Sequence, residues 1–113
     1  MSRKQGRRRA VSRRKPAYTL SQVRDLIRKG KCWVNENALC DARIAFGWGR
    51  ADIESALKAL QVKDFYKSEP HRFVPDTMMD YYKARDLKGE KVYTHFYVDP
   101  QRRILVVSSF KEI

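Results

Sequence analysis

The sequence predicts a single α+β domain in which N-terminal helices pack on a C-terminal antiparallel β-sheet. Three observations lead to this prediction. The length of 113 residues fits one ordinary domain. Apolar residues recur at three- and four-residue spacing in the first half of the chain and at every second residue near its end. No apolar run approaches the roughly 20 residues needed to cross a bilayer, and none follows the basic start as in a signal peptide, so we expect a cytoplasmic protein.

The chain starts with a strongly basic segment. Eight of its 25 Lys and Arg residues lie in residues 1–15, which contain no acid, and the whole chain has a formal charge of +12. The composition changes at Pro16, so we predict a disordered tail over residues 1–16 and a folded domain over residues 17–113. Nucleic acid is the favoured partner of such a tail; acidic lipid and a merely solubilising arm are the alternatives. The arginines concerned are Arg3, Arg7, Arg8, Arg9, Arg13 and Arg14.

The first helix is predicted from its ends and from its apolar side. Thr19 or Ser21 can cap its start, and Gly30 stops it. One side of this helix carries Leu20, Val23, Leu26 and Ile27. Residues 31–34 are predicted to form a short extended piece.

Two further helices follow. Asn35 can cap the second, which ends at Gly47. The third runs from about Ala51 to Leu60, because its apolar residues repeat at three and four and Asp52 stands in the favourable first turn. The loop between them contains the sequence Gly-Trp-Gly, which lacks the rest of a dinucleotide-binding motif.

Beyond Val62 the pattern changes to that of strands. Aromatic residues indicate strands that Pro70 and Pro75 interrupt. Residues 90–98 alternate between apolar and polar or aromatic side chains, residues 99–102 are typical of a turn, and residues 103–110 return as a strand apolar enough to be central. The end of the chain is therefore predicted to be an antiparallel hairpin.

The polar face of the strand over residues 90–98 suggests a binding surface. It carries Tyr93, His95 and Tyr97, which we expect to face solvent if the other side of the strand packs on the helices. Aromatic rings stack on bases while Lys and Arg hold phosphates, a combination that favours single-stranded RNA. Ordinary cross-strand pairing without a ligand is the alternative.

The strand half of the chain also holds groups suited to cutting RNA. Cleavage without a metal needs a base for the 2′-hydroxyl, cations for the phosphorane and an acid for the leaving oxygen. Lys67, Arg85, Tyr93, His95 and Lys111 can supply these functions. The pattern by itself leaves binding and catalysis both open.

The sequence predicts no metal site and no cofactor. Cys32 and Cys40 are eight residues apart and both histidines lie far from them, so no zinc-binding spacing is present. No P-loop and no nucleophile-elbow motif occurs either.

Four ordered motifs carry a family resemblance. They are Leu-Ser-Gln-Val at residues 20–23, Asp-Phe-Tyr-Lys-Ser at residues 64–68, Gly-Glu-Lys-Val-Tyr at residues 89–93 and Val-Val-Ser-Ser-Phe-Lys-Glu at residues 106–112. Together they closely resemble the MqsR family of bacterial type II toxins. The resemblance covers residues 18–113 and leaves out the basic tail.

The resemblance implies a RelE-like fold and a sequence-selective mRNA endoribonuclease acting on GCU-type sites. It also implies a cognate MqsA-like antitoxin, encoded nearby, which itself binds zinc and DNA, so that this chain meets DNA only through the antitoxin. The family's catalytic residues fall on Lys67, Tyr93 and Lys111. A family glutamine falls on Met79, which raises the question of how substrate is positioned.

The roles expected from these residues are those of a metal-independent nuclease. Lys67 and Lys111 would stabilise the phosphorane, and Tyr93 would orient the 2′-hydroxyl or transfer a proton. His95, with an ordinary pKa near 6.5, is our added candidate for acid or base. Further RNA contacts are expected from Arg85, Tyr97 and Tyr82.

The products of this reaction would be a 2′,3′-cyclic phosphate and a 5′-hydroxyl, and loss of mRNA would inhibit translation and growth. Two other functions remain open from the sequence. One is a non-catalytic RNA- or ribosome-binding module with a degenerate site marked by Met79. The other is an interaction protein of a repressor complex whose basic tail contacts DNA.

Overall fold

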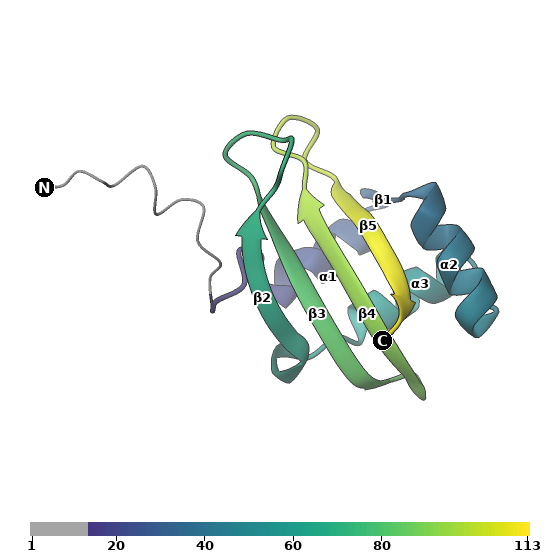
Figure 1. Cartoon of the computed structure of the whole chain (residues 1–113). Helices are drawn as coiled ribbons and strands as arrows, with labels where there is room; N and C mark the ends of the chain where they lie inside the picture. Colours follow the sequence, from purple (N-terminus) through teal and green to yellow (C-terminus); the bar gives the residue numbers. More distant parts are fainter. Residues whose placement is uncertain (1–13) are drawn as a thin grey trace, which may run out of the picture.

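The computed structural model describes residues 14–113, and the predictions for the arginines from Arg3 to Arg13 lie outside this range. The described residues form an α+β fold in which helices precede most of the sheet (Figure 1). In chain order the elements are α1 (Leu20–Arg28), β1 (Cys32–Val34), α2 (Glu36–Phe46), α3 (Arg50–Lys58), a 3-10 turn (Val62–Asp64), β2 (Phe65–Pro70), β3 (Met78–Leu87), β4 (Glu90–Val98) and β5 (Leu105–Glu112).

The sheet has five strands in the order β1-β5-β4-β3-β2. Strands β2 to β5 pair antiparallel, as predicted. The short extended piece predicted over residues 31–34 forms β1, which pairs parallel with β5, with Cys32 opposite Leu105 and Val34 opposite Val107, so the sheet is mixed and not antiparallel throughout. A parallel neighbour needs a long crossover connection, and here most of the chain lies between the two strands. Local sequence patterns carry no information about such a distant partner.

The predicted ends of the first two helices are confirmed, whereas the third helix ends at Lys58, two residues before the predicted Leu60. The Thr19 side chain accepts a hydrogen bond from the Gln22 N–H at 3.0 Å and caps α1. Asn35 stands at the start of α2, and Gly47 ends that helix in the left-handed conformation at φ 74° that glycine tolerates best. Helix α3 starts one residue earlier than expected, and the Asp52 carboxylate accepts a hydrogen bond from the Gly49 N–H at 3.0 Å.

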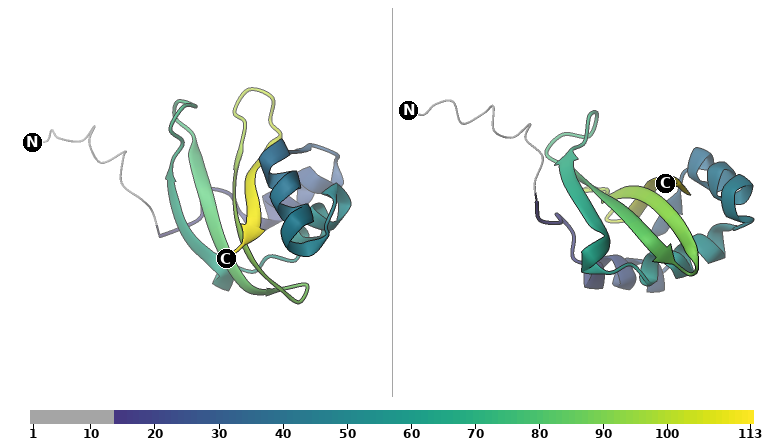
Figure 2. Two further views of the ribbon diagram at one scale, coloured as in Figure 1. Left: turned by 45° about the vertical axis from the view of Figure 1, so that its right-hand side comes forward. Right: turned by 60° about the horizontal axis from the view of Figure 1, so that its bottom comes forward.

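The core lies between the helices and one face of the sheet (Figure 2). Helix α2 packs along β5, and the rings of Phe46 and Trp48 contact Phe110. Farther along the sheet the Tyr82 and Phe96 rings stack with centroids 5.5 Å apart. We call this side of the sheet the covered face and its opposite side the open face.

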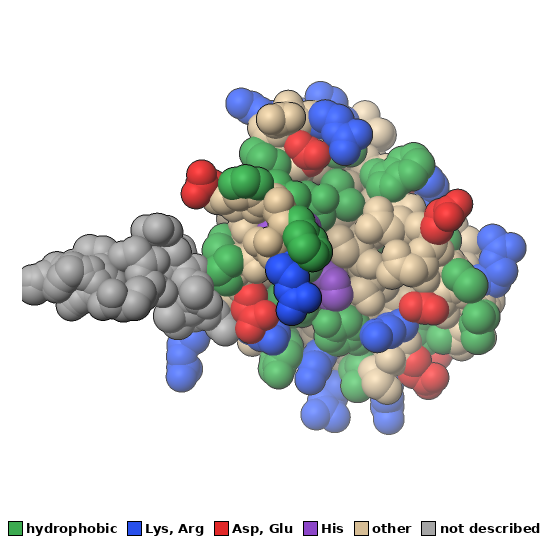
Figure 3. Space-filling model, turned by 45° about the horizontal axis from the view of Figure 1, so that its top comes forward, with side chains coloured by type: hydrophobic (Ala, Val, Ile, Leu, Met, Phe, Trp, Pro, Cys, Tyr) green, Lys and Arg blue, Asp and Glu red, His purple; other side chains and the backbone are tan. Residues whose placement is uncertain are grey.

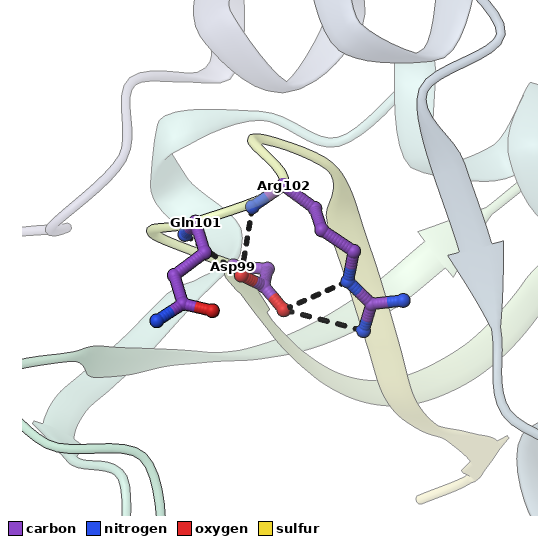
Figure 4. A network of polar contacts seen from close by, with 3 residues as sticks. All are labelled: Asp99, Gln101 and Arg102. Atoms are coloured by element: carbon purple, nitrogen blue, oxygen red, sulfur yellow. Dashed lines mark hydrogen bonds and ion pairs between the residues drawn. The ribbon is translucent and has the colours of Figure 1, made fainter.

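The predicted turn between β4 and β5 is organised by Asp99 (Figure 4). One carboxylate oxygen accepts hydrogen bonds from the Gln101 and Arg102 N–H groups at 2.8 and 3.0 Å, and the other pairs with the Arg102 guanidinium at 3.3 Å. The Arg102 N–H bond is the main cause that holds the pKa of Asp99 below its ordinary value. Strand β5 starts at Leu105, two residues later than predicted, because Arg103 still belongs to the turn with φ 58°.

The start of the described domain is clamped to β3. The Asp80 carboxylate accepts hydrogen bonds from the N–H groups of Ala17 and Tyr18 at 2.9 and 3.0 Å, and the Tyr18 hydroxyl donates to the Met78 carbonyl at 2.7 Å. Burial raises the pKa of Asp80, while these N–H donors act in the opposite direction. The chain therefore enters the fold at a fixed point beside β3.

Candidate active site

The open face gathers side chains from four strands into two cross-strand rows. The first row runs Lys67, Tyr81, His95 and Ser109, and the second runs Lys83, Tyr93 and Lys111. These residues alternate with the buried residues of the covered face, so their side chains point away from the helices. Residues that are up to 44 positions apart in the sequence, such as Lys67 and Lys111, are thereby brought to one surface.

A bulge in β2 places Lys67 on this surface. Phe65 pairs with Tyr82 and Lys67 pairs with Tyr81, so the register shifts between them. Without the extra residue, Phe65 and Lys67 would point to the same side of the strand. With it, the Phe65 ring packs against Tyr82 at 5.6 Å on the covered face, and Lys67 lies on the open face.

Tyr93 and His95 form a hydrogen-bonded pair. The Tyr93 hydroxyl lies 2.9 Å from Nδ1 of His95. Burial, followed by the charges of Lys111, His71 and Lys67, lowers the pKa of His95 to about 4, and burial raises the pKa of Tyr93. At neutral pH the imidazole is therefore uncharged, and we assign the Tyr93 hydroxyl as donor to Nδ1.

Lys67 is held as an ammonium at one side of this pair. Its Nζ lies 3.0 Å from a Glu69 carboxylate oxygen and 4.8 Å from the centroid of the Tyr81 ring. The hydrogen bond that the Lys67 ammonium donates to the Glu69 carboxylate is the main cause that raises the pKa of Lys67. This lysine is consequently suited to stabilising negative charge and unsuited to removing a proton at neutral pH.

Lys111 stands at the other side of the same rings. Its Nζ lies 5.5 Å from the centroid of the Tyr93 ring. Lys67 and Lys111 belong to strands separated by β3 and β4, so their backbones lie about 14 Å apart across the sheet, and the two rows are offset by about 7 Å along the strands. Between them the Tyr81 ring contacts His95, with centroids 4.7 Å apart. A phosphate lying over these rings would meet an ammonium on each side.

Figure 3 shows the molecule with the top of Figure 1 turned forward, and on this side histidine, hydrophobic and basic side chains lie next to one another. Within the described residues no group of three or more His, Cys, Asp or Glu side chains is arranged to hold a metal ion. The arrangement offers an uncharged base, a hydroxyl and two cations. These groups are suited to activating a 2′-hydroxyl and to stabilising a phosphorane, and the acid for the leaving oxygen is not among them.

Three other predicted RNA contacts lie outside the two rows. Tyr97 follows His95 on β4 and packs against the edge of the His71 ring at 4.5 Å. Arg85 lies on β3, beyond Lys83, and lines a small groove of about 190 Å³. Arg14 is exposed at the start of the described residues.

The expectation that Tyr82 contacts RNA was wrong. Tyr82 is fully buried on the covered face, and its neighbour Tyr81 is the tyrosine on the open face. The sequence pattern does not single out Tyr81, because two adjacent tyrosines fit either phase of strand alternation. The available signal was Ala84, an apolar residue two positions from Tyr82 and therefore on the same side.

Met79, at the position of the family's glutamine, lies on β3 two residues before Tyr81. It pairs with Glu69 and is almost fully buried. An apolar thioether therefore occupies a place beside Lys67 and Tyr81 where an amide would offer hydrogen bonds.

The fold and this surface define a small α+β protein with a basic and aromatic cluster on the uncovered side of its sheet. A family model described as "Motility quorum-sensing regulator, toxin of MqsA" matches residues 15–112, and the chain belongs to this family. It is thus a toxin of a toxin-antitoxin system, with an antitoxin as its partner. No curated protein matches the chain. None of the helices in the described residues is long and apolar enough to cross a membrane.

Proposed function

We propose that this toxin is a metal-independent endoribonuclease that cuts single-stranded mRNA in the cytoplasm at GCU-type sites. The observation that carries the proposal is the meeting of Lys67, Tyr93, His95 and Lys111 on one face of the sheet, from three different strands. The resemblance assigns the site selectivity and a RelE-like fold. We assign zinc binding and operator DNA to the MqsA-like antitoxin.

The Tyr93 and His95 pair is suited to removing the proton of the 2′-hydroxyl. In this step the 2′-hydroxyl gives its proton to the Tyr93 oxygen while Tyr93 passes its own proton to Nδ1 of His95. A pKa of about 4 makes His95 a weak base in the free protein. An RNA phosphate bound between Lys67 and Lys111 would offset their charges, which contribute to that low pKa.

The two lysines are suited to the phosphoryl group. The 2′-oxygen forms its bond to phosphorus, and the bond from phosphorus to the 5′-oxygen then breaks. Lys67 and Lys111 stabilise the extra negative charge of the phosphorane between these two events. The leaving 5′-oxygen takes a proton from water, and the hydroxide that remains takes up the proton held by His95, which restores the uncharged imidazole. The products are a 2′,3′-cyclic phosphate and a 5′-hydroxyl, and the loss of mRNA stops translation and growth.

We assign residues 17–113 as the ribonuclease domain and residues 1–16 as an arm that strengthens binding to RNA without selecting a sequence. The eight basic residues in residues 1–15 support this assignment. Removal of the arm is expected to weaken RNA binding mainly at low salt. Unchanged affinity and unchanged salt dependence would contradict it.

The test is cleavage of a defined mRNA in EDTA, with mapping of the 5′ ends. Wild-type protein is expected to cut at selected sites and to leave 5′-hydroxyl ends. Lys67→Ala, Tyr93→Phe and Lys111→Ala should each lower the rate by about a hundredfold or more. Lys29→Ala, on the exposed side of α1 where Lys29 pairs with Asp25, is the matched control and should cut normally.

The alternative function is a non-catalytic RNA- or ribosome-binding module, and the position of Met79 beside Lys67 favours it. RNA that is bound tightly and stays intact would support this alternative. In that case Met79→Gln, which restores the amide, is the variant to assay next.

A further inference from the structure

The loop between β2 and β3, residues 71–77, carries an exposed aromatic side chain that the fold does not use. Phe73 is 81% exposed, the highest value among the large hydrophobic residues of the described chain. Phe73 is not part of the hydrophobic core, so its side chain adds little apolar burial to the stability of the fold. An exposed phenylalanine of this kind is available for a ligand.

The backbone that presents Phe73 is firmly held. The His71 N–H donates to the Thr77 carbonyl at 2.7 Å and closes the loop. Nδ1 of His71 accepts hydrogen bonds from the N–H groups of Phe73 and Val74 at 3.0 and 3.1 Å, and the Thr77 hydroxyl donates to the Pro75 carbonyl at 3.0 Å. The exposed ring is therefore presented by an ordered loop, which lowers the entropy cost of binding to it.

The loop continues the aromatic path of the open face. Tyr97 is two residues beyond His95 on β4, about 7 Å along the strand, and its ring lies 4.5 Å from that of His71. The centroids of His71 and Phe73 are 6.4 Å apart. Aromatic and histidine rings thus follow one another from the candidate site to the tip of the loop. The exposed, positively charged Arg72 lies between His71 and Phe73 in the sequence.

We infer that Phe73, together with His71 and Tyr97, forms a subsite that stacks on a nucleobase flanking the cleaved bond. Arg72 contacts the adjoining phosphate. The inference rests on the proposed function, because it takes RNA to be bound at His95 and to extend from there along Tyr97 to the loop. Stacking on aromatic side chains accepts every base, so this subsite adds affinity and extends the length of RNA that is bound.

RNA fits this loop better than a protein partner does. Phe73 follows the basic residue Arg72 and is the one large exposed hydrophobic side chain of this loop, whereas a stable protein interface buries about 800 Å² on each partner. Base stacking needs only one exposed face of one ring. Docking of the antitoxin on Phe73 is the competing outcome that the experiment must detect.

The experiment measures binding of a short single-stranded RNA that contains one GCU triplet and carries a 2′-deoxy sugar at the cleaved nucleotide, which blocks attack. Phe73→Ala is expected to weaken binding roughly tenfold, since stacking contributes about 1–3 kcal/mol per base. Phe73→Trp should restore affinity. Ile44→Ala, on α2 and 79% exposed, is the matched control and should bind as wild type.

A second series separates stacking from an indirect effect on the loop. The RNA is made abasic at one position at a time on each side of the cleaved bond. At one flanking position, loss of the base should weaken wild-type binding and leave Phe73→Ala unchanged. If every abasic RNA weakens both proteins equally, or if Phe73→Ala binds as Ile44→Ala does, the subsite is refuted.

The two proposals fail in different ways. If binding of the 2′-deoxy RNA depends on Phe73 but wild-type protein never cuts the unmodified RNA, the ribonuclease proposal is refuted. The stacking of RNA on Phe73 would then still stand. Cleavage with binding that is indifferent to Phe73 would refute the subsite alone. If Phe73→Ala weakens binding of the purified antitoxin and leaves RNA binding unchanged, the loop is a protein contact and the inference is overturned.

Discussion

The two faces of the sheet are built from the same strands and have opposite compositions. On β4 the covered face receives Val92, Thr94 and Phe96, all of them buried, whereas the open face receives Tyr93 and His95, which are partly exposed. Neighbouring residues of a strand point to opposite faces. Each residue that packs the core therefore also fixes the direction of a candidate site residue beside it.

Charge separates the two faces as well. Among the described residues Asp80 is the one charged side chain that is buried, and it accepts hydrogen bonds from the N–H groups of Ala17 and Tyr18. On the open face Lys67 and Lys111 stand beside tyrosine rings and keep contact with solvent. The buried core that stabilises the fold therefore lies on one side of these strands, and the candidate site lies on the other.

The largest expected effect compares two neighbours on β4. Phe96→Ala removes a fully buried ring that stacks on Tyr82 and should lower the free energy of unfolding by about 3–5 kcal/mol. His95→Ala removes a side chain of the open face and should abolish cleavage while leaving stability within about 1 kcal/mol of wild type. Urea unfolding of both variants measures the difference, and equal destabilisation would contradict the separation of the faces.

The clamp at Asp80 gives the next largest effect. Asp80→Ala leaves the Ala17 and Tyr18 N–H groups without their acceptor and should lower the free energy of unfolding by about 1–3 kcal/mol. Limited proteolysis should then cut near residues 17 and 18 sooner than in wild type. If the cutting rate there is unchanged, the carboxylate does not hold the start of the domain.

His95 makes the open face sensitive to acid. Its ordinary pKa is near 6.5 and its pKa in the folded protein is about 4. Between these pH values the unfolded chain binds a proton that the folded protein does not, so stability is fully present above pH 6.5 and falls as pH is lowered toward 4. The kcat/KM of cleavage, which reports on the free protein, should accordingly stay flat through pH 6.5, where an ordinary histidine would titrate.

The measurement is urea unfolding across this pH range for wild type and His95→Gln. The variant should lose less stability on acidification. His71, whose pKa burial also lowers, and Asp80 titrate in both proteins, and the difference between the two curves removes their contributions. Curves that stay parallel from pH 6.5 to 4 would show that His95 is not the group responsible.

The smallest effect tests the adjacent tyrosines on β3. The Tyr82 hydroxyl is buried without a hydrogen-bond partner in the described structure, so Tyr82→Phe should leave the free energy of unfolding unchanged or raise it by up to about 1 kcal/mol. Cleavage should also be unchanged, because Tyr82 lies on the covered face. A clear loss of cleavage in Tyr82→Phe would contradict this and show that the Tyr82 hydroxyl takes part in the reaction.

Local signals predicted most of the secondary structure. Helix ends followed from Thr19, Asn35 and Gly47, and the hairpin of β4 and β5 followed from alternation and from the turn at Asp99. These features depend on residues within a few positions of each other. Residue chemistry placed Lys67 and Lys111 among several candidates, and the resemblance supplied the family and assigned these two lysines and Tyr93 as its catalytic residues.

The sequence by itself therefore determined the elements, the face of β4 and the family. The tertiary structure decided that β1 joins β5 in parallel, that a bulge brings Lys67 onto the open face, and that Tyr81 lies there while Tyr82 is buried. Strand alternation has two possible phases, and a slip of one residue or a bulge exchanges them. Only the packing of distant strands on the helices selects one phase, because only that packing buries one side.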